Sequence, residues 1–246
     1  MSAARLVLLH GFTQGGGIWV PVMERLTVRC PIDAPDLPGH GAASDHGTDM
    51  ATTADELVSR FGRGAWVGYS MGGRLALHLA LRHLDAVSHL VLCSTTAGLR
   101  TEAERADRRA SDAALAERIR SIGLDSFLDE WLAQPLFATL KPDRIGADID
   151  AEVRAANTVE GLATSLEVNG TGAQDSLWDS LADLSMPVLV VTGGLDRKFG
   201  ELGEQLVTSI GDNATHTVVP HCGHAVPFED PATFSAIVDV FLRRNS

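Results

Sequence analysis

The first hundred residues alternate between short apolar runs and amphipathic segments. Four of the apolar runs have the length and composition of buried β-strands, and they cover residues 5–9, 27–33, 66–69 and 89–93. Helical periodicity marks the segments between them. A first helix is predicted over residues 51–61, and its start carries two capping-box pairs, Thr52 with Asp55 and Thr53 with Glu56. A second helix is predicted after residue 70, with one apolar face made of Leu75, Leu79 and Leu84.

This order of strand, helix, strand, helix and strand predicts a mostly parallel central sheet with helices on both faces. The alternation stops near residue 101, because residues 101–172 contain no convincing strand and have the pattern of four helices. It resumes with strands predicted at 187–192 and 216–219 and helices predicted at 201–210 and 231–242. We therefore expect an α/β core of residues 1–100 and 173–246. Residues 101–172 would form a helical cap over the strand ends, where such sheets bind ligands.

Composition and charge argue against several classes of function. The formal net charge of −12 argues against non-specific binding to nucleic acid or to an anionic membrane. No apolar run reaches the roughly 18 residues of a membrane span. Residues 1–9 lack the basic start and long apolar stretch of a secretory signal, so a cytoplasmic location is expected. The sequence makes no prediction of oligomeric state.

The three cysteines, Cys30, Cys93 and Cys222, have no metal-like spacing and are predicted to be reduced core thiols. No metal site is expected from them. For Cys222, the alternative to a core thiol is a role in the active site, because it precedes His224 by two residues.

Residues 68–72 contain the motif G-x-S-x-G between a predicted strand and a predicted helix. A serine on such a sharp turn takes a strained backbone, and its flanking positions must be small to avoid clashes. The turn raises the hydroxyl above the sheet and points the helix N-terminus at the reacting oxygen. Ser70 is therefore the candidate nucleophile or base, and a tight packing turn is the alternative.

A serine hydroxyl needs a histidine to accept its proton and a carboxylate to orient that histidine. His224 follows the last predicted strand, and Asp196 follows the strand predicted at 187–192. The chain order Ser, Asp, His is the usual one for this arrangement. The alternatives are His221 for the histidine, and Asp212 or Asp230 for the carboxylate.

Stabilising a negative oxygen requires two backbone N–H groups. Met71, directly after the serine, is expected to supply one of them, and Phe12 in the loop after the first strand is the candidate for the other. Glycines at positions 15–17 permit close backbone approach in that loop. Residues 36–41 form a second Gly/Pro-rich turn, expected to shape the pocket wall.

Four motifs in combination resemble the α/β-hydrolase superfamily over the whole chain. They are His10-Gly11-Phe12, Asp36-Leu37-Pro38-Gly39-His40-Gly41, Gly68-Tyr69-Ser70-Met71-Gly72-Gly73 and Gly223-His224. The resemblance implies the α/β-hydrolase fold but not one reaction, because this fold hosts many.

A second set of motifs, mostly in the insertion, resembles a narrower family. The set is Arg74 after Ser70-Met71-Gly72-Gly73, Gly98-Leu99-Arg100, Arg105-Ala106-Asp107-Arg108-Arg109, Trp131-Leu132-Ala133-Gln134-Pro135-Leu136-Phe137, Asn169-Gly170-Thr171-Gly172-Ala173-Gln174-Asp175-Ser176-Leu177-Trp178 and Asp196-Arg197-Lys198-Phe199. These residues resemble the 2-succinyl-6-hydroxy-2,4-cyclohexadiene-1-carboxylate synthases of menaquinone biosynthesis. The resemblance implies a lyase that eliminates pyruvate, with the triad acting as a base and without a cofactor.

The same resemblance implies which residues bind the anionic substrate. They would be Arg74, Arg108, Arg154, Trp131 and Tyr69. The physical chemistry agrees, because the substrate carries three carboxylates and arginine grips a carboxylate with two hydrogen bonds. Arg74 also lies one helical turn after Ser70. The alternatives are a solvated surface charge for each arginine and core packing for Trp131.

Two other function classes stay open on the sequence alone. A hydrolase of the same fold could use the triad on an ester or a carbon–carbon bond. A ligand receptor could keep the fold without catalysis, although a receptor does not need all three triad residues.

Overall fold

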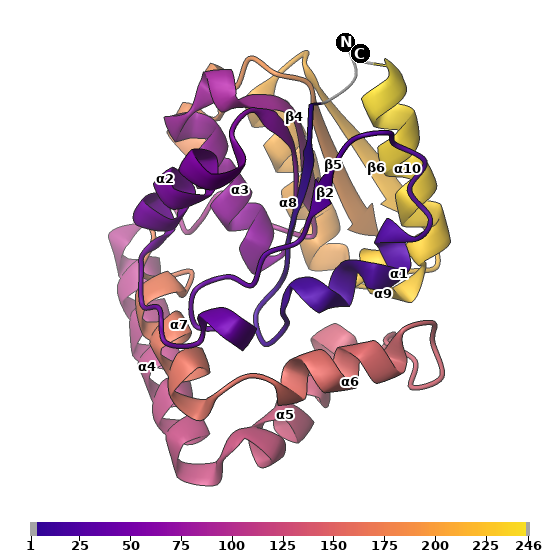
Figure 1. Ribbon diagram of the computed structural model, residues 1–246. Coiled ribbons are helices and arrows are strands. Elements are labelled where there is room, and N and C mark those ends of the chain that lie inside the picture. Colours follow the sequence, from indigo (N-terminus) through magenta and orange to yellow (C-terminus); the bar gives the residue numbers. More distant parts are fainter. Residues whose placement is uncertain (1–3, 245–246) are drawn as a thin grey trace.

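The computed structural model describes residues 4–244 of the chain. Over that range, six β-strands form one sheet in the order β2-β1-β3-β4-β5-β6 (Figure 1). The strands are β1 (Leu6–Leu9), β2 (Ile32–Asp33), β3 (Gly64–Tyr69), β4 (Val87–Cys93), β5 (Val188–Gly193) and β6 (Ala214–Val219). Every neighbouring pair is parallel. The parallel sheet predicted from the alternation of elements is confirmed.

Helices cover both faces of this sheet, as Figure 1 shows. On one face lie α2 (Met50–Phe61), α3 (Met71–Arg82) and α8 (Arg197–Ile210). On the other face lie α1 (Val20–Met23), α9 (Val226–Glu229) and α10 (Pro231–Arg244). Successive side chains of each strand point to opposite faces, so Trp66 packs with the first group and Val67 with the second. The inner strands β1, β3, β4 and β5 are buried on both sides, which explains their continuous apolar runs.

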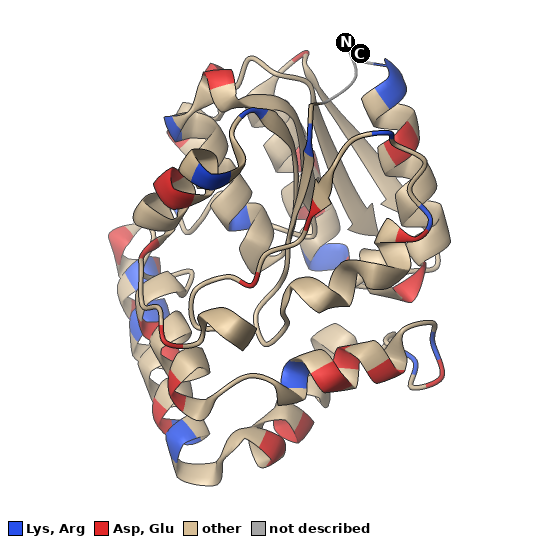
Figure 2. Cartoon of the chain, viewed as in Figure 1, with Lys and Arg blue, Asp and Glu red and all other residues tan. Residues whose placement is uncertain are grey.

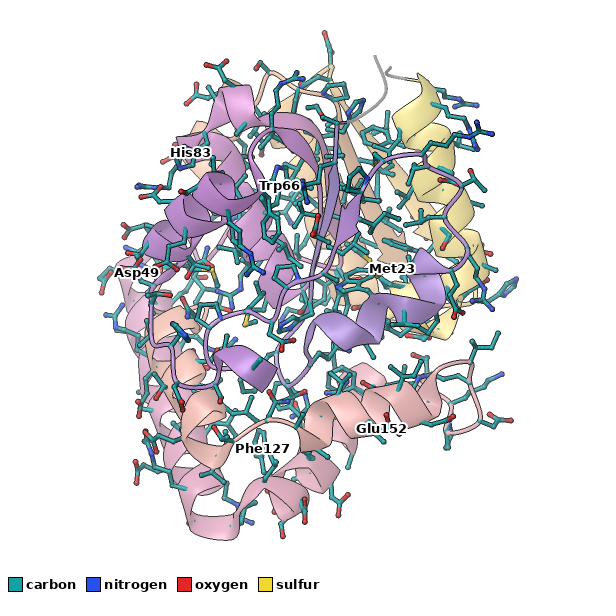
Figure 3. The ribbon with its side chains drawn as sticks, viewed as in Figure 1. Met23, Asp49, Trp66, His83, Phe127 and Glu152 are labelled. Atoms are coloured by element: carbon teal, nitrogen blue, oxygen red, sulfur yellow. The ribbon has the colours of Figure 1, made fainter. Side chains whose placement is uncertain are left out.

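Four helices lie beyond the ends of β5 and β6, whose arrowheads point toward them in Figure 1. They are α4 (Glu102–Ile122), α5 (Leu124–Leu132), α6 (Ala147–Ala155) and α7 (Val159–Asn169). These helices have a hydrophobic cluster of their own, which includes Ile119, Phe127 and Leu162. Figure 3 shows Phe127 among these helices and Trp66 beside the sheet. Short 3-10 turns complete the chain at Gly16–Trp19, Gly41–Ala43, Leu84–Ala86, Pro135–Phe137 and Trp178–Asp183.

The second predicted strand is shorter than its apolar run. Only Ile32 and Asp33 pair with β1, although the run begins at residue 27. The reason is a competing partner, because the backbone N–H and the hydroxyl of Thr27 both donate to the Asp239 carboxylate of α10, at 2.9 and 2.6 Å. The start of the run is therefore hydrogen-bonded to α10 and does not pair with a strand of the sheet.

Two helices begin earlier than their hydrophobic periodicity predicts, and in both an aspartate caps the first turn. α8 begins at Arg197, four residues earlier than predicted, because Asp196 accepts the backbone N–H of Phe199 at 3.2 Å. α2 is capped by Asp49, which accepts the backbone N–H of Thr52 at 2.7 Å. The predicted capping boxes of α2 are therefore wrong. α3 ends at Arg82, which leaves Leu84 outside the helix.

Charged residues lie almost entirely on the helices and loops (Figure 2). α4 and α6 carry both signs along their length, and the strands are nearly free of charge. The negative excess of the chain is therefore spread over its exterior. Within residues 4–244, no helix combines the length and the apolar character that crossing a membrane requires.

Candidate active site

The turn between β3 and α3 holds Ser70 in a strained conformation. Its φ of 52° and ψ of −110° lie outside the regions that non-glycine residues favour. A Cβ atom on Gly68 would come within 2.3 Å of the Gly72 carbonyl oxygen, and one on Gly72 within 2.2 Å of the Leu9 carbonyl oxygen. The chain can therefore make this turn only with glycine at both positions, as the motif predicts.

Two hydrogen bonds secure the strained serine. Its backbone N–H donates to the Cys93 carbonyl at 2.9 Å, and its own carbonyl accepts the Thr95 hydroxyl at 2.8 Å. Both partners lie at the end of the neighbouring strand β4 or just after it. Thr95 is not among the predicted site residues, and the only sign of it in the sequence is its place two residues after that strand.

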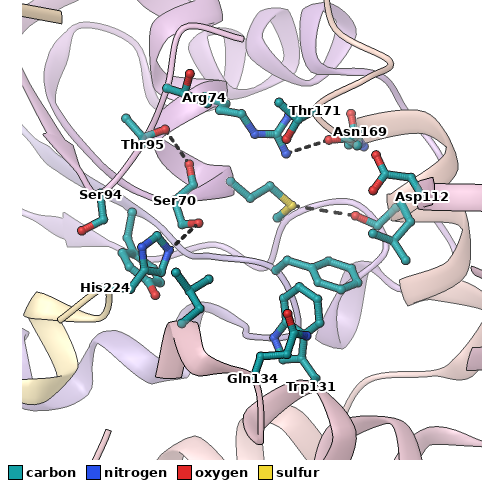
Figure 4. A pocket seen from close by; sticks show the side chains of 18 of the residues that line it. Ser70, Arg74, Ser94, Thr95, Asp112, Trp131, Gln134, Asn169, Thr171 and His224 are labelled. Carbon is teal, nitrogen blue, oxygen red and sulfur yellow. Dashed lines mark hydrogen bonds between the residues drawn. The ribbon is translucent and has the colours of Figure 1, made fainter. Parts of the chain in front are cut away.

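The Ser70 hydroxyl lies 3.2 Å from His224 Nε2 (Figure 4). On the other side of the ring, His224 Nδ1 lies 2.9 Å from Asp196 Oδ2. The histidine is 2% exposed and the aspartate side chain 8%. A carboxylate can only accept a hydrogen bond, so Nδ1 carries the proton and Nε2 accepts from the serine hydroxyl. The loops after β3, β5 and β6 thus bring together three residues that are far apart in the sequence.

None of the alternative residues occupies this position. His221 is exposed, and Asp212 is exposed in the turn before β6. Asp230 accepts the backbone N–H of Thr233 at 2.9 Å, at the start of α10. Cys222 is buried outside the cavity lining, and burial raises the pKa of its thiol to about 12.

Two backbone N–H groups near Ser70 have no acceptor among residues 4–244. In the loop after β1, the N–H of Gly11 donates to Gln14 Oε1 at 3.1 Å and that of Thr13 to His40 Nε2 at 3.3 Å. The N–H of Phe12, between them, has no such bond, and neither has that of Met71 at the start of α3. Both residues line the cavity. Unbonded donors of this kind suit a developing negative oxygen.

Two buried histidines and an aspartate stabilise the loop that contains Phe12 by accepting backbone hydrogen bonds. His10 Nε2 accepts the backbone N–H of Leu37 at 2.9 Å, and the ring of His40 lies 5.0 Å from that of His10. Burial lowers the pKa of His10 to about 4 and that of His40 to about 3, so both rings are neutral acceptors at neutral pH. Asp36 accepts the backbone N–H of Gly16 at 2.7 Å. Residues 36–41 thus support this loop.

A cavity of about 630 Å³ opens above Ser70, between the sheet and the helices of residues 102–169. Its walls include all of the residues that the resemblance proposes for substrate binding, namely Tyr69, Arg74, Arg108, Trp131 and Arg154. Within the described part of the chain, no group of three His, Cys, Asp or Glu residues could hold a metal ion.

The three arginines have different partners. Arg154 Nε donates to Asp150 at 2.8 Å, and its Nη1 bonds the Thr13 hydroxyl. Arg108 Nε donates to Asp112 at 2.8 Å. Arg74 bonds two neutral acceptors, the side chain of Gln174 and the carbonyl of Asn169.

Aromatic rings form the rest of the wall. The Trp131 ring lies 5.1 Å from that of Phe12, and the Tyr69 ring lies 5.4 Å from that of His224. The Phe199 ring is nearer to His224, at 4.4 Å. Sequence reasoning gave Phe199 no role of its own. The feature that points to Phe199 is its position on the first turn of α8, three residues after Asp196.

Comparisons with known proteins cover nearly the whole chain. Residues 6–237 match the alpha/beta hydrolase family. A 2-succinyl-6-hydroxy-2,4-cyclohexadiene-1-carboxylate synthase of Salmonella paratyphi C (strain RKS4594) is 34% identical over 94% of this chain and 90% of its own. The structure of MenH from S. aureus superposes with a TM-score of 0.88 at 28% identity, over 98% of this chain and 94% of that one. A thermophilic esterase from Thermogutta terrifontis gives a TM-score of 0.83 at 25% identity, over 99% and 91%.

Proposed function

The chain belongs to the α/β-hydrolase family and, within it, to the 2-succinyl-6-hydroxy-2,4-cyclohexadiene-1-carboxylate synthases, and from that premise we propose that it is a lyase. The reaction is the elimination of pyruvate from 2-succinyl-5-enolpyruvyl-6-hydroxy-3-cyclohexene-1-carboxylate. Its other product is 2-succinyl-6-hydroxy-2,4-cyclohexadiene-1-carboxylate. This places the enzyme in menaquinone biosynthesis.

One observation carries the proposal. The hydrogen-bonded chain of Ser70, His224 and Asp196 lies at a cavity whose wall contains three arginines. The proposed substrate has three carboxylates, and the planar guanidinium group matches a carboxylate with two parallel hydrogen bonds. A basic centre and several anion-binding groups thus share one enclosed space.

The triad acts as a base in this reaction. Asp196 fixes the tautomer of His224, whose free Nε2 takes the proton of the Ser70 hydroxyl. Ser70 Oγ removes the ring proton next to the succinyl ketone, and the N–H groups of Phe12 and Met71 bind the enolate oxygen that forms.

The electron pair then moves through the ring double bond and breaks the bond between the ring carbon and the enolpyruvyl oxygen. The ketone is restored, and the ring gains the conjugated diene of the product. His224 returns its proton to the departing enolpyruvate, which becomes pyruvate. Since the succinyl ketone accepts the electrons, the elimination does not call on a redox partner.

A hydrolase of esters is the second candidate, because the Thermogutta esterase shares the fold over nearly all of both chains. The same triad would then form an acyl-enzyme on Ser70. The two candidates differ in their products and in their reaction with phosphonate probes.

The test supplies the purified enolpyruvyl substrate and follows pyruvate with a coupled dehydrogenase. Hydrolysis of p-nitrophenyl esters and labelling by a fluorophosphonate are measured on the same preparation. The proposal expects rapid pyruvate release that far exceeds ester hydrolysis. Efficient ester hydrolysis without any pyruvate release would favour the hydrolase.

A further inference from the structure

The charges of the three cavity arginines are compensated to different degrees. Arg108 and Arg154 each form an ion pair, with Asp112 and Asp150 respectively, both at 2.8 Å. Among residues 4–244, no carboxylate lies within ion-pair distance of Arg74. Its side chain is nevertheless buried, with the residue only 7% exposed. Arg74 thus carries a positive charge that no residue in contact with it neutralises.

Neutral oxygens hold the Arg74 guanidinium in place. Nη1 donates to Gln174 Oε1 at 2.6 Å, and Nη2 donates to the Asn169 carbonyl at 2.8 Å. Figure 4 shows Arg74 extending from α3 toward Asn169 at the end of α7. The guanidinium group has five N–H donors, so the two bonds leave other donors for the cavity that Arg74 lines.

The Gln174 side chain is itself tightly enclosed. It is 5% exposed, and a Cβ atom on Gly98 would lie 2.7 Å from its Nε2 atom. Gly98 has a φ of 97°, and its carbonyl accepts the indole N–H of Trp178 at 2.8 Å, which ties the two segments together. Gln174 does not line the cavity. It therefore makes no direct contact with a molecule in the cavity, and its hydrogen bond to Arg74 links it to the cavity wall.

We propose that Gln174 is a positioning residue that fixes Arg74 through a neutral amide and so leaves the full guanidinium charge available to a substrate carboxylate. A glutamate has the same shape and would make the same contact, but it would neutralise that charge within the protein. The role of Gln174 is thus electrostatic as well as geometric. This inference rests on the proposed function, because it assumes an anionic substrate.

Gln174→Glu tests the charge directly. Because a charge-assisted hydrogen bond to the substrate is weakened, we expect KM for pyruvate release to rise about tenfold or more, while kcat stays within about threefold. Gln205→Glu is the matched control. Gln205 is exposed on α8 and accepts from Arg100 Nη2 at 3.4 Å, outside the cavity. Adding the same charge beside that arginine is expected to leave both kinetic constants unchanged.

Gln174→Met separates the charge from the packing. Methionine fills a similar volume but accepts no strong hydrogen bond, so Arg74 keeps its charge and loses one support. KM is expected to rise less in this variant than in Gln174→Glu, and thermal unfolding confirms that both proteins are folded. A KM increase in Gln174→Met equal to or above that in Gln174→Glu would overturn the electrostatic role, as would a fall in kcat alone.

A binding measurement keeps this inference separate from the proposed reaction. Citrate, a tricarboxylate, is titrated calorimetrically into wild type, Gln174→Glu and Gln205→Glu at low ionic strength. Weaker binding by Gln174→Glu alone supports the inference even if wild type releases no pyruvate, a result that would reject only the proposed function. If neither KM nor citrate binding distinguishes Gln174→Glu from wild type, the inference is wrong.

Discussion

At the scale of single residues, Asp196 shows how one side chain serves both the fold and the site. Its Oδ1 atom accepts the backbone N–H of Phe199 and caps α8, while Oδ2 accepts from His224. The two functions depend on different properties. Capping needs an acceptor oxygen, whereas orienting the imidazole and stabilising its protonated form needs a carboxylate.

Asp196→Asn is therefore expected to separate activity from stability. Asparagine caps helices as well as aspartate does, so the melting temperature should stay close to that of wild type. Pyruvate release should fall by about a hundredfold or more, because the amide cannot stabilise the protonated imidazole. Asp196→Ala should lose activity and also about 1 kcal/mol of stability from the missing cap. Near-normal turnover in Asp196→Asn would contradict this account of the triad.

Gly72→Ala tests the packing of the turn that holds Ser70. The new Cβ would meet the Leu9 carbonyl oxygen at 2.2 Å, so the backbone must shift. We expect a loss of about 1–3 kcal/mol in the free energy of unfolding, measured with urea, together with reduced activity. Gly200→Ala is the control, because nothing lies within 4 Å of its added Cβ on α8. Equal stability of both variants would show that the turn tolerates a side chain.

The sequence predicts the triad because Ser70, Asp196 and His224 each follow a predicted strand, which favours them over the alternative residues. It does not predict the partner of Arg74. Gln174 lies a hundred residues further along the chain, and only the packing of the segment after α7 against Gly98 brings the two together. No local pattern encodes such a contact.

At the scale of elements, α4 is the helix whose start is most completely specified. Thr101 accepts the backbone N–H of Glu104 at 3.2 Å, and the Glu104 carboxylate accepts the backbone N–H of Thr101 at 2.8 Å. This reciprocal pair is a capping box. The helix that it starts carries Arg108, one of the cavity arginines.

Thr101→Ala removes one half of that box. The expected cost is about 0.5–2 kcal/mol in the free energy of unfolding, because the Glu104 N–H loses its acceptor. Urea denaturation followed by circular dichroism measures it. Thr101→Ser keeps the hydroxyl and should change stability little. An alanine variant as stable as the serine variant would mean that water replaces the cap at no cost.

The sequence predicts an element well where one local signal dominates and poorly where a distant partner competes with that signal. The buried parallel strands were visible as apolar runs, since both of their faces are covered. The run at residues 27–33 contains only a two-residue strand, because Asp239 of α10 binds Thr27. That partner is more than two hundred residues away, so the competition was invisible in the local pattern.

At the scale of the whole molecule, buried neutral histidines link stability to pH. Burial lowers the pKa of His10 to about 4, that of His40 to about 3 and that of His78 to about 4. Unfolding returns each group to its ordinary value near 6.5. Between these values the unfolded chain binds more protons than the folded one, so stability falls as the pH decreases.

We therefore expect the free energy of unfolding to decrease as the pH falls from about 6.5 toward 4. Each histidine contributes a slope of at most about 1.4 kcal/mol per pH unit. Urea titrations at several pH values measure the slope. Replacing His78, which lies on α3 away from the cavity wall, with leucine should make the slope shallower. An unchanged slope would show that His78 is not held neutral in the folded state.

The account as a whole depends on Ser70 acting as the base of an elimination, and the Ser70→Ala variant tests this most directly. The measurement is the rate of pyruvate release at saturating substrate, with substrate affinity determined in parallel by calorimetry. We predict that pyruvate release is abolished while substrate still binds with nearly wild-type affinity, because the arginines and the cavity are unchanged. Pyruvate release at the wild-type rate from Ser70→Ala would contradict the central claim.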